Sequence, residues 1–308
     1  MSLVAAHEAL IGGAAIRAAV ELRVLERLGE TALDARGLAE VCDLSERGSR
    51  SLLLALAALG VVEPVASGCY RAVDGAELAG PMLTLHDDLA EAVRSGRPTE
   101  AWDSGRVADA VYPGLVRVLA ELVRAAADRA AAFLGEPGGR VLDVAAGAAP
   151  WSLAVASRDP TVTVTALDLP GVIPETVRSV KERAMEGRYR FLAGDAFSCD
   201  LEGPYDLVLV ANLCHLFDAT ANVRLLGRLR GALAEGGRIA VIDVMPVGGR
   251  VPPGVALYQL SLVLRTRGGA AHPFSAYVDW LTRSGYRGLD RIALEESSQL
   301  TLVVASDG

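Results

Sequence analysis

The sequence predicts an α/β fold: a mostly parallel sheet with an antiparallel hairpin at its C-terminal end, preceded by an all-helical domain of winged-helix type. Three observations carry this prediction. Residues 140–149 form an aliphatic run with one acid that breaks at once into small residues, as a buried parallel strand does before a tight turn. Strand-like and helical segments then alternate up to residue 243. Two further strand-like runs, 288–294 and 300–305, end the chain.

The composition bounds the possible partners. The chain has 308 residues, of which 51% are hydrophobic and 22% charged, with a net charge of −8. At ~100–200 residues per domain, this length predicts two domains. The acidic balance argues against nucleic acid as the main partner, because phosphate binding needs clustered Lys and Arg. Ala is abundant and Arg is strongly preferred over Lys, so an Ala within a motif is weaker evidence here than usual.

The cysteines and the apolar runs bear on location. Cys42, Cys69, Cys199 and Cys214 show neither paired spacing nor a metal-type repeat, which favours a reduced protein. The N-terminus lacks the basic region, apolar core and cleavage site of a signal peptide. No apolar run approaches the ~18 residues that a membrane span needs. We therefore expect a soluble, cytoplasmic protein with no membrane partner.

The first 100 residues predict the helical domain. Apolar residues follow helical spacing over 3–28 and again over 52–59, with Ser45 as the expected N-cap of the second helix. Gly12-Gly13 marks either a break between two helices or a close helix contact. Two strand-like runs around Ser67-Gly68 then form the wing: 61–65 and 69–73.

A winged helix raises the possibility of DNA binding, but the composition of this one favours a protein interface. The would-be recognition helix carries Arg47 and Arg50 and then becomes almost wholly apolar. An apolar helix suits a protein surface better than a phosphate backbone. We therefore expect a homodimer formed through this domain, and no nucleic-acid partner.

Residues 101–138 are predicted to bridge the two domains. Residues 80–98 before them are irregular, with a helical piece over 87–94 and a surface or capping His86. One or two long helices, rich in Ala and Leu, then lead to the turn cluster 135–139. The predicted organisation is a winged-helix-like domain over 1–100, bridging helices over 101–138 and an α/β domain over 139–308.

The α/β domain is predicted from alternating segments. The expected strands after the first one are 162–167, 189–193, 205–210 and 238–243, and the expected helices are 172–185, 220–234 and 274–284. Asp168 ends the second strand about 20 residues past the small-residue turn. A carboxylate at this distance suits a ribose, because it can accept hydrogen bonds from both hydroxyls. The alternative is an ordinary βαβ unit with an acid at a strand end.

Five motifs stand in series along this domain. They are Leu142-Asp143-Val144-Ala145-Ala146-Gly147, Leu167-Asp168-Leu169-Pro170-Gly171-Val172-Ile173, Gly194-Asp195-Ala196-Phe197, Asn212-Leu213-Cys214-His215-Leu216-Phe217-Asp218 and the run 232–239. Together they resemble class I S-adenosylmethionine-dependent methyltransferases. More narrowly, nearly the whole chain resembles the two-domain small-molecule O-methyltransferases of plants and of bacterial natural-product pathways. The resemblance implies a Rossmann-like sheet and a dimerising N-terminal domain.

The resemblance also implies a cofactor and the residues that bind it. The first motif is the family's glycine-rich turn, the second its ribose-binding segment, and the third holds the adenine between an acid and an apolar neighbour. The S-adenosyl-L-methionine site implied by these motifs consists of Asp143, Ala145, Gly147, Asp168, Leu169, Gly194, Asp195, Ala196, Phe197 and Asn212.

The fourth motif resembles the segment that carries the family's catalytic histidine, here His215. The sulfonium is already an activated electrophile, so the protein needs only to hold a hydroxyl oxygen in line and remove its proton. A histidine oriented by an acid does this near neutral pH, and Asp243 is the candidate acid. The alternative is a structural His215 at a helix start. A metal site from His215 and His272 lacks an acid at position 216, so we expect no metal.

Two departures from the family pattern affect these expectations. Ala145 and Ala149 stand where the family usually has glycines, which reflects either the Ala-rich composition or altered cofactor binding. Leu216 and Phe217 replace an acid and a tryptophan that often follow the histidine. The expected walls of the acceptor pocket are Trp102, Tyr112, Phe217 and Tyr258, although each of them could equally be packing.

The leading hypothesis is O-methylation of a small aromatic or polyketide-like hydroxyl in secondary metabolism, such as antibiotic biosynthesis. An alternative keeps the fold and the cofactor site but has hydroxylase, decarboxylase or pericyclic activity, or methylates carbon or nitrogen. A ligand-responsive DNA-binding regulator rests only on the winged helix and fails on charge. The sequence does not identify the acceptor.

Overall fold

A computed structural model describes residues 3–65, 68–73, 75–76, 88–103, 105–248, 251–295 and 299–306. The chain divides into two compact units, Met1–Asp87 and Asp88–Gly308. The helices expected within 101–138 therefore belong with the sheet. Ser67 and His86 lie outside the described residues. Within the described ranges, no helix has both the length and the apolar character needed to cross a membrane.

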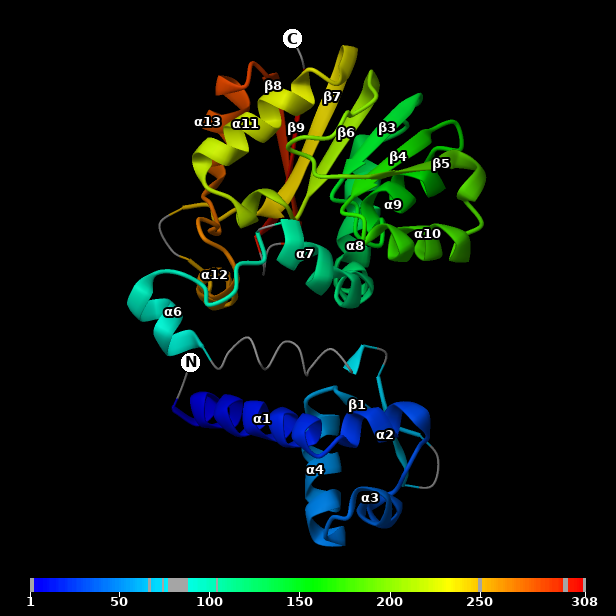
Figure 1. Ribbon diagram of the computed structural model, residues 1–308, viewed down its shortest axis with the longest axis vertical. Coiled ribbons are helices and arrows are strands. Elements are labelled where there is room, and N and C mark those ends of the chain that lie inside the picture. Colours follow the sequence, from blue (N-terminus) through cyan, green and yellow to red (C-terminus); the bar gives the residue numbers. More distant parts are fainter. Residues whose placement is uncertain are drawn as a thin grey trace. The chain divides into compact units, whose positions relative to one another are not determined.

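The first unit is helical with a small hairpin (Figure 1). Asp34 and Ser45 begin the third and fourth helices by accepting hydrogen bonds from the amides of Gly37 and Gly48, so the predicted cap at Ser45 is confirmed. The short strands pair antiparallel, as predicted for the wing. The elements of this unit are α1 (Leu3–Glu21), α2 (Val24–Glu30), α3 (Ala35–Cys42), α4 (Glu46–Ala58), β1 (Val62–Pro64) and β2 (Tyr70–Ala72).

The predicted break in the first helical run lies at Arg23 and not at Gly12-Gly13. Helix α1 passes through both glycines, and a Cβ at Gly12 would lie 3.1 Å from Leu59 Cδ2. The small residue therefore serves a close helix contact, which was the other interpretation of this pair. Arg23 has a φ of 58°, a left-handed conformation that cannot continue a helix, so α2 starts after it.

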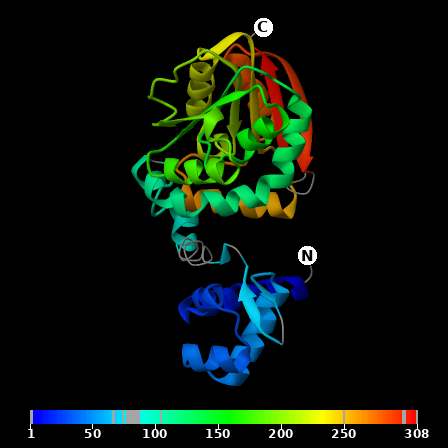
Figure 2. The same ribbon diagram turned by 90° about the vertical axis from the view of Figure 1, so that its right-hand side faces the viewer.

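The second unit begins with helices and continues into a seven-stranded sheet (Figures 1 and 2). The leading helices are α6 (Leu89–Ser95), α7 (Gly105–Val111), the 3-10 turn η2 (Tyr112–Gly114) and α8 (Val116–Leu134). The strands are β3 (Arg140–Val144), β4 (Thr163–Asp168), β5 (Tyr189–Ala193), β6 (Tyr205–Ala211), β7 (Leu233–Val244), β8 (Arg287–Glu295) and β9 (Leu300–Ser306). The helical elements between them are α9 (Pro150–Arg158), α10 (Ile173–Glu182), η3 (Glu186–Arg188), η4 (Cys214–Leu216), α11 (Ala219–Arg230), α12 (Pro253–Arg265) and α13 (Phe274–Arg283).

The strand order is β5-β4-β3-β6-β7-β9-β8. The first five strands are parallel, whereas β9 runs antiparallel to both β7 and β8. The predicted mostly parallel sheet with an antiparallel C-terminal hairpin is therefore confirmed. The winding reverses between β3 and β6, and ligands of open α/β sheets bind at such a reversal, beyond the carboxyl ends of the strands.

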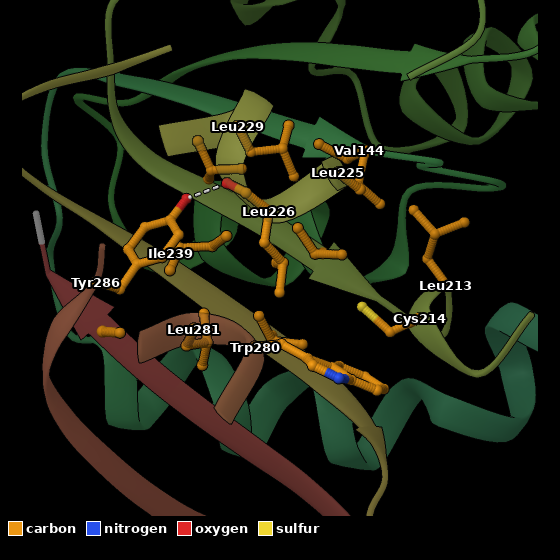
Figure 3. Packing of buried hydrophobic residues seen from close by; sticks show 14 of the residues in the cluster. Val144, Leu213, Cys214, Leu225, Leu226, Leu229, Ile239, Trp280, Leu281 and Tyr286 are labelled. Carbon is orange, nitrogen blue, oxygen red and sulfur yellow. Dashed lines mark hydrogen bonds between the residues drawn. The ribbon is translucent and has the colours of Figure 1, made fainter. Parts of the chain in front are cut away.

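Both faces of the sheet are covered, which explains the near-continuous apolar strands. Side chains alternate between two clusters, so that Leu142 and Val208 pack on one side and Val141 and Leu207 on the other. Helices α11 and α13 cover the first side, and α8 and α9 the second. Figure 3 shows part of the first cluster, where the Tyr286 hydroxyl donates a hydrogen bond of 3.1 Å to the Leu226 carbonyl.

Two predicted boundaries are wrong or incomplete. The helix expected over 220–234 ends at Arg230, because Leu233 already pairs with Tyr205 in the sheet. Strand β7 therefore begins before Gly236-Gly237 and not after it. Helix α12 is absent from the sequence prediction, although it carries Tyr258.

Candidate functional site

The turn after β3 is built from small residues in left-handed conformations. Ala145, Gly147 and Ala149 have φ values of 56°, 57° and 59°. The amide of Gly147 donates a hydrogen bond of 2.7 Å to Asp168 Oδ2, and its carbonyl accepts one of 2.6 Å from the Thr176 hydroxyl. The turn is thus fastened to the end of β4 and to α10.

Asp168 occupies the carboxyl end of β4. Besides the Gly147 amide, its carboxylate accepts the Leu169 amide at Oδ1, at 2.7 Å. Burial raises the pKa of Asp168 to about 6, against the lowering effect of these two amides, and the charge of Asp109 raises it further. A carboxylate offers about four lone-pair positions, so two remain for a pair of ribose hydroxyls. This donor and acceptor set fits a nucleoside cofactor.

Asp143 and Ala149 support the turn from inside the protein. Asp143 is 1% exposed and accepts a hydrogen bond of 2.5 Å from the hydroxyl of Ser152 in α9. Burial raises its pKa to about 7, although the Ser152 bond lowers it. The Ala149 methyl is fully buried and packs in a cluster with Leu153 and Val180. Both side chains therefore hold α9 in place beneath the turn.

The segment after β5 adjoins Asp168. The Gly194 amide donates to the Asp168 carbonyl at 2.9 Å, and a Cβ on Gly194 would lie only 2.7 Å from Cys199 Cβ. Asp195 Oδ1 accepts the Phe197 amide at 2.9 Å. The Phe197 ring meets the Phe217 ring edge-on, with centroids 4.9 Å apart. The third motif is therefore brought beside the second, and Phe197 beside the segment that carries His215.

His215 is buried beside Asp243, the last residue but one of β7. The Asp243 carboxylate accepts the His215 amide at Oδ2, 3.0 Å away, and the His215 ring Nδ1 lies 2.8 Å from Oδ1. Since a carboxylate only accepts, Nδ1 carries the proton of this bond. The other ring nitrogen, Nε2, has no hydrogen-bond partner among the described residues. Asn212, just before, has a φ of 51° and turns the chain out of β6.

Aromatic residues of this unit contact the His215 ring or one another. The Tyr258 ring lies 5.5 Å from the His215 ring, and Trp102 meets Tyr112 edge-on at 6.3 Å. Burial raises the pKa of both Tyr112 and Tyr258 above its usual value. The charge of Asp168 contributes at Tyr112 and that of Asp243 at Tyr258, so these two of the expected wall residues lie near the two acids. The other two, Trp102 and Phe217, pack against Tyr112 and Phe197.

His272 has a structural contact of its own. Its Nε2 lies 2.8 Å from the Phe217 carbonyl and donates to it, and its ring packs edge-on against Trp280 at 4.7 Å. Burial lowers the pKa of His272. The Ala270 amide also donates to the His215 carbonyl, so this loop is fastened to η4. In the part of the chain that the structure describes, no three His, Cys, Asp or Glu side chains are grouped to hold a metal ion.

Three further residues of this region escaped the sequence analysis. Ser152 holds Asp143, and Asp109 of α7 accepts the Gly171 amide at 2.5 Å beside the ribose-binding segment. Arg265 ends α12, with its guanidinium carbon 5.5 Å from the centre of the Tyr258 ring. None belongs to a recognisable motif. The only signal was Pro253 followed by apolar residues, which is typical of a helix start.

Several known proteins are similar to this chain. Residues 111–287 match the family described as the O-methyltransferase domain. The chain is 30% identical over 287 residues to acetylserotonin O-methyltransferase of Mus musculus molossinus, covering 80% of this chain and 73% of that protein. It is 24% identical to the 3-hydroxy-5-methyl-1-naphthoate 3-O-methyltransferase of Streptomyces sahachiroi, covering 88% and 84%. Human N-acetylserotonin methyltransferase in complex with SAM has the same fold, with a TM-score of 0.79, 21% identity and coverage of 99% and 96%.

Proposed function

Because the chain belongs to the O-methyltransferase domain family, whose members use S-adenosylmethionine, we propose that it methylates an aromatic hydroxyl of a small natural product. The observation that carries this proposal is the contact between His215 Nδ1 and Asp243 Oδ1, at 2.8 Å. It leaves His215 Nε2 as the proton acceptor, at the edge of the sheet where ligands of such folds bind.

Cofactor binding is assigned to the three segments that meet around Asp168. The backbone of the turn 145–149 would face the methionine end, and the remaining lone pairs of Asp168 would accept the ribose hydroxyls. Asp195 and the Phe197 ring would hold the adenine by a polar and an apolar contact. When bound, the sulfonium supplies an activated methyl group, so the protein needs no further electrophile.

The two alanines of the turn are compatible with this assignment. Ala149 directs its methyl group into the cluster with Leu153 and Val180, so it does not narrow the room above the turn. Ala145 packs against the core on the α11 side. This removes the sequence-based reason for favouring a non-methylating activity on the same fold.

His215 acts as the general base in the proposed reaction. Asp243 holds the ring through Nδ1 and fixes its tautomer, while Nε2 takes the proton of the acceptor hydroxyl as the oxygen attacks the methyl carbon. Burial of the pair excludes competing water. Holding the oxygen in line with the methyl group supplies the rest of the rate enhancement.

The acceptor is inferred to be aromatic. Tyr258 offers a flat apolar surface beside the base, and the pairs Trp102–Tyr112 and Phe197–Phe217 offer further aromatic surface in the same unit. The relative from Streptomyces sahachiroi is named for a hydroxynaphthoate, an acceptor that such surfaces would suit. A polyketide-derived phenol of one to three fused rings is therefore the proposed acceptor class.

A homodimer through the first unit is also proposed. Leu10 and Ile11 of α1 are 74% and 55% exposed, and Leu54 of α4 is 58% exposed. Helices α1 and α4 contact each other, and exposed apolar side chains on both favour a protein interface. A second copy of the chain is the proposed occupant, because a symmetric dimer uses the same surface twice.

The test of the methyl transfer uses S-adenosylmethionine carrying a labelled methyl group and a panel of hydroxynaphthalenes, hydroxybenzenes and anthraquinone phenols. We expect a labelled methyl ether and one equivalent of S-adenosylhomocysteine per turnover. Product labelled at carbon or nitrogen would contradict O-methylation. Conversion of an acceptor without release of S-adenosylhomocysteine would instead support a non-methylating activity.

A further inference from the structure

Arg265, the last residue of α12, carries a buried donor without an acceptor. Its Nε atom is buried and makes no hydrogen bond within the described chain. Its guanidinium forms no ion pair within the described residues, and its side-chain hydrogen bond is with Tyr258. A buried donor in this condition has lost water and gained no hydrogen-bond acceptor, which is unfavourable. An anionic ligand would satisfy it.

The position of Arg265 links it to the proposed acceptor site. Its guanidinium carbon lies 5.5 Å from the centre of the Tyr258 ring, and that ring lies 5.5 Å from the His215 ring. The positive charge also acts on the Tyr112 hydroxyl, where it opposes the rise in pKa caused by burial. The guanidinium of Arg265 and the imidazole of His215 therefore both lie next to the Tyr258 ring.

We propose that Arg265 binds a carboxylate of the acceptor, so that the preferred substrates are aromatic hydroxy acids and not neutral phenols. This inference rests on the proposed methyl transfer. The guanidinium is a planar fork that matches a carboxylate with two parallel hydrogen bonds. An aromatic ring system would carry the carboxylate to Arg265 and the hydroxyl to His215 Nε2.

The neighbouring acids limit where the carboxylate binds. Asp103 Oδ2 accepts the Arg267 amide at 2.8 Å, while its Oδ1 is buried without a partner. The charge of Asp103 acts on the Tyr112 hydroxyl, so it would repel a carboxylate on that side. The charge of Asp243 acts on Tyr258 in the same way, and the proposed binding position is therefore the unpartnered Nε of Arg265.

The experiment compares three acceptors that differ only in charge: a hydroxynaphthoate, its primary amide and the corresponding naphthol. KM and kcat are measured for the wild type, for Arg265→Gln and for Arg265→Lys. The matched control is Arg267→Gln, since Arg267 is exposed and lies just beyond the end of the same helix. We expect Arg265→Gln to raise KM for the carboxylate by about 10- to 100-fold, the usual worth of one charged hydrogen bond. KM for the amide and the naphthol should stay within twofold, and Arg267→Gln should change none of the three.

Equal KM values of the wild type for the carboxylate and the amide, or an equal rise for all three acceptors in Arg265→Gln, would overturn the proposal. If Arg265→Gln does not fold, KM for the three acceptors is compared between the wild type and Arg265→Lys. Lysine replaces the planar guanidinium with a point charge, so the difference in KM between the carboxylate and the amide should become smaller.

Binding without turnover separates this proposal from the methyl transfer. Calorimetry of the three acceptors with the wild type loaded with S-adenosylhomocysteine measures recognition alone. Tighter binding of the carboxylate, lost in the variant, supports Arg265 even if no acceptor is methylated. Equal binding of all three acceptors would contradict the proposal whether or not methyl transfer occurs.

Discussion

Asp243 contacts His215 twice, accepting its backbone amide at Oδ2 and its ring Nδ1 at Oδ1, at 3.0 and 2.8 Å. Oδ1 also accepts the amide of Val244 at 2.9 Å. The carboxylate is therefore held by its own strand, and in turn fixes both the backbone and the ring of His215. This double contact orients the imidazole without help from solvent.

Replacing His215 should reveal its role as a base. We expect His215→Ala to lower kcat by about 10²- to 10⁴-fold, the usual contribution of general acid–base catalysis, with little change in cofactor affinity. Asp243→Asn should cost less, because the ring remains. The defect of His215→Ala should shrink along a series of increasingly acidic phenols, since an ionised phenol needs no base.

His272 provides the control for this prediction. Its ring binds the Phe217 carbonyl and not an acceptor, so His272→Gln should lower the melting temperature without any dependence on phenol acidity. Wild-type turnover by His215→Ala on every accepted substrate would make His215 structural.

The sheet was predictable because buried parallel strands leave a local signature. The runs that became β3 and β5 are short, apolar and bounded by turn residues, and their boundaries are close to those predicted. The start of β7 was not predictable, because residues 232–234 (Ala-Leu-Ala) have no local bias against a helix. Pairing of Leu233 with Tyr205, distant in sequence, decides their conformation.

The candidate site was predictable only where a motif names its residues. His215, Asp243 and Asp168 each follow or end a strand, so topology alone brings them to one edge. Helix α12 escaped prediction because its apolar residues form no single stripe: Leu257 is 67% exposed, whereas Leu262 is buried. Arg265 depends on the placement of that helix, and no spacing rule could have located it.

Removing the carboxylate of Asp168 should weaken S-adenosylmethionine binding. Asp168→Asn keeps one oxygen for a backbone amide but loses the charge and half of the acceptor positions. Charged hydrogen bonds are each worth ~1.5–3 kcal/mol, so we expect affinity to fall by about tenfold or more. Calorimetry measures this, and Asp206→Asn, near the amino end of β6 and so at the other edge of the sheet, is the control. Unchanged affinity in a folded Asp168→Asn variant would contradict the ribose assignment.

An acidic residue on the exposed apolar face of the first unit should dissociate the proposed dimer. Leu10→Glu and Leu54→Glu each place a charge on α1 or α4, and burying an unpaired charge in an interface is strongly unfavourable. Light scattering at low micromolar concentration should show twice the chain mass for the wild type and the single chain mass for both variants. Leu122→Glu, on α8 and equally exposed at 76%, should stay dimeric. A monomeric wild type would exclude the dimer. If only Leu122→Glu dissociated the dimer, the interface would lie on the second unit and not on the first.

Asp143 should make the stability of the protein depend on pH. Burial raises its pKa to about 7, whereas the unfolded chain has an ordinary aspartate with a pKa near 3.8. Between these values the folded state holds a proton that the unfolded state has released, so the free energy of unfolding falls as pH rises from about 4 to 7. Asp168, with a pKa of about 6, acts in the same direction.

Asp143→Asn removes the larger of these two effects, since the amide stays neutral and its oxygen still accepts the Ser152 hydroxyl. Relative to the wild type, the variant should gain stability between pH 5 and 8, at about 1.4 kcal/mol per pKa unit of the shift. Urea unfolding at several pH values measures the difference. Asp159→Asn is a control in which pH should have the opposite effect. Hydrogen bonds from Thr161 lower the pKa of Asp159, so the contribution of Asp159 to the free energy of unfolding is lost as pH falls. Parallel stability curves for the wild type and Asp143→Asn would mean that Asp143 is already ionised in the folded protein at pH 5.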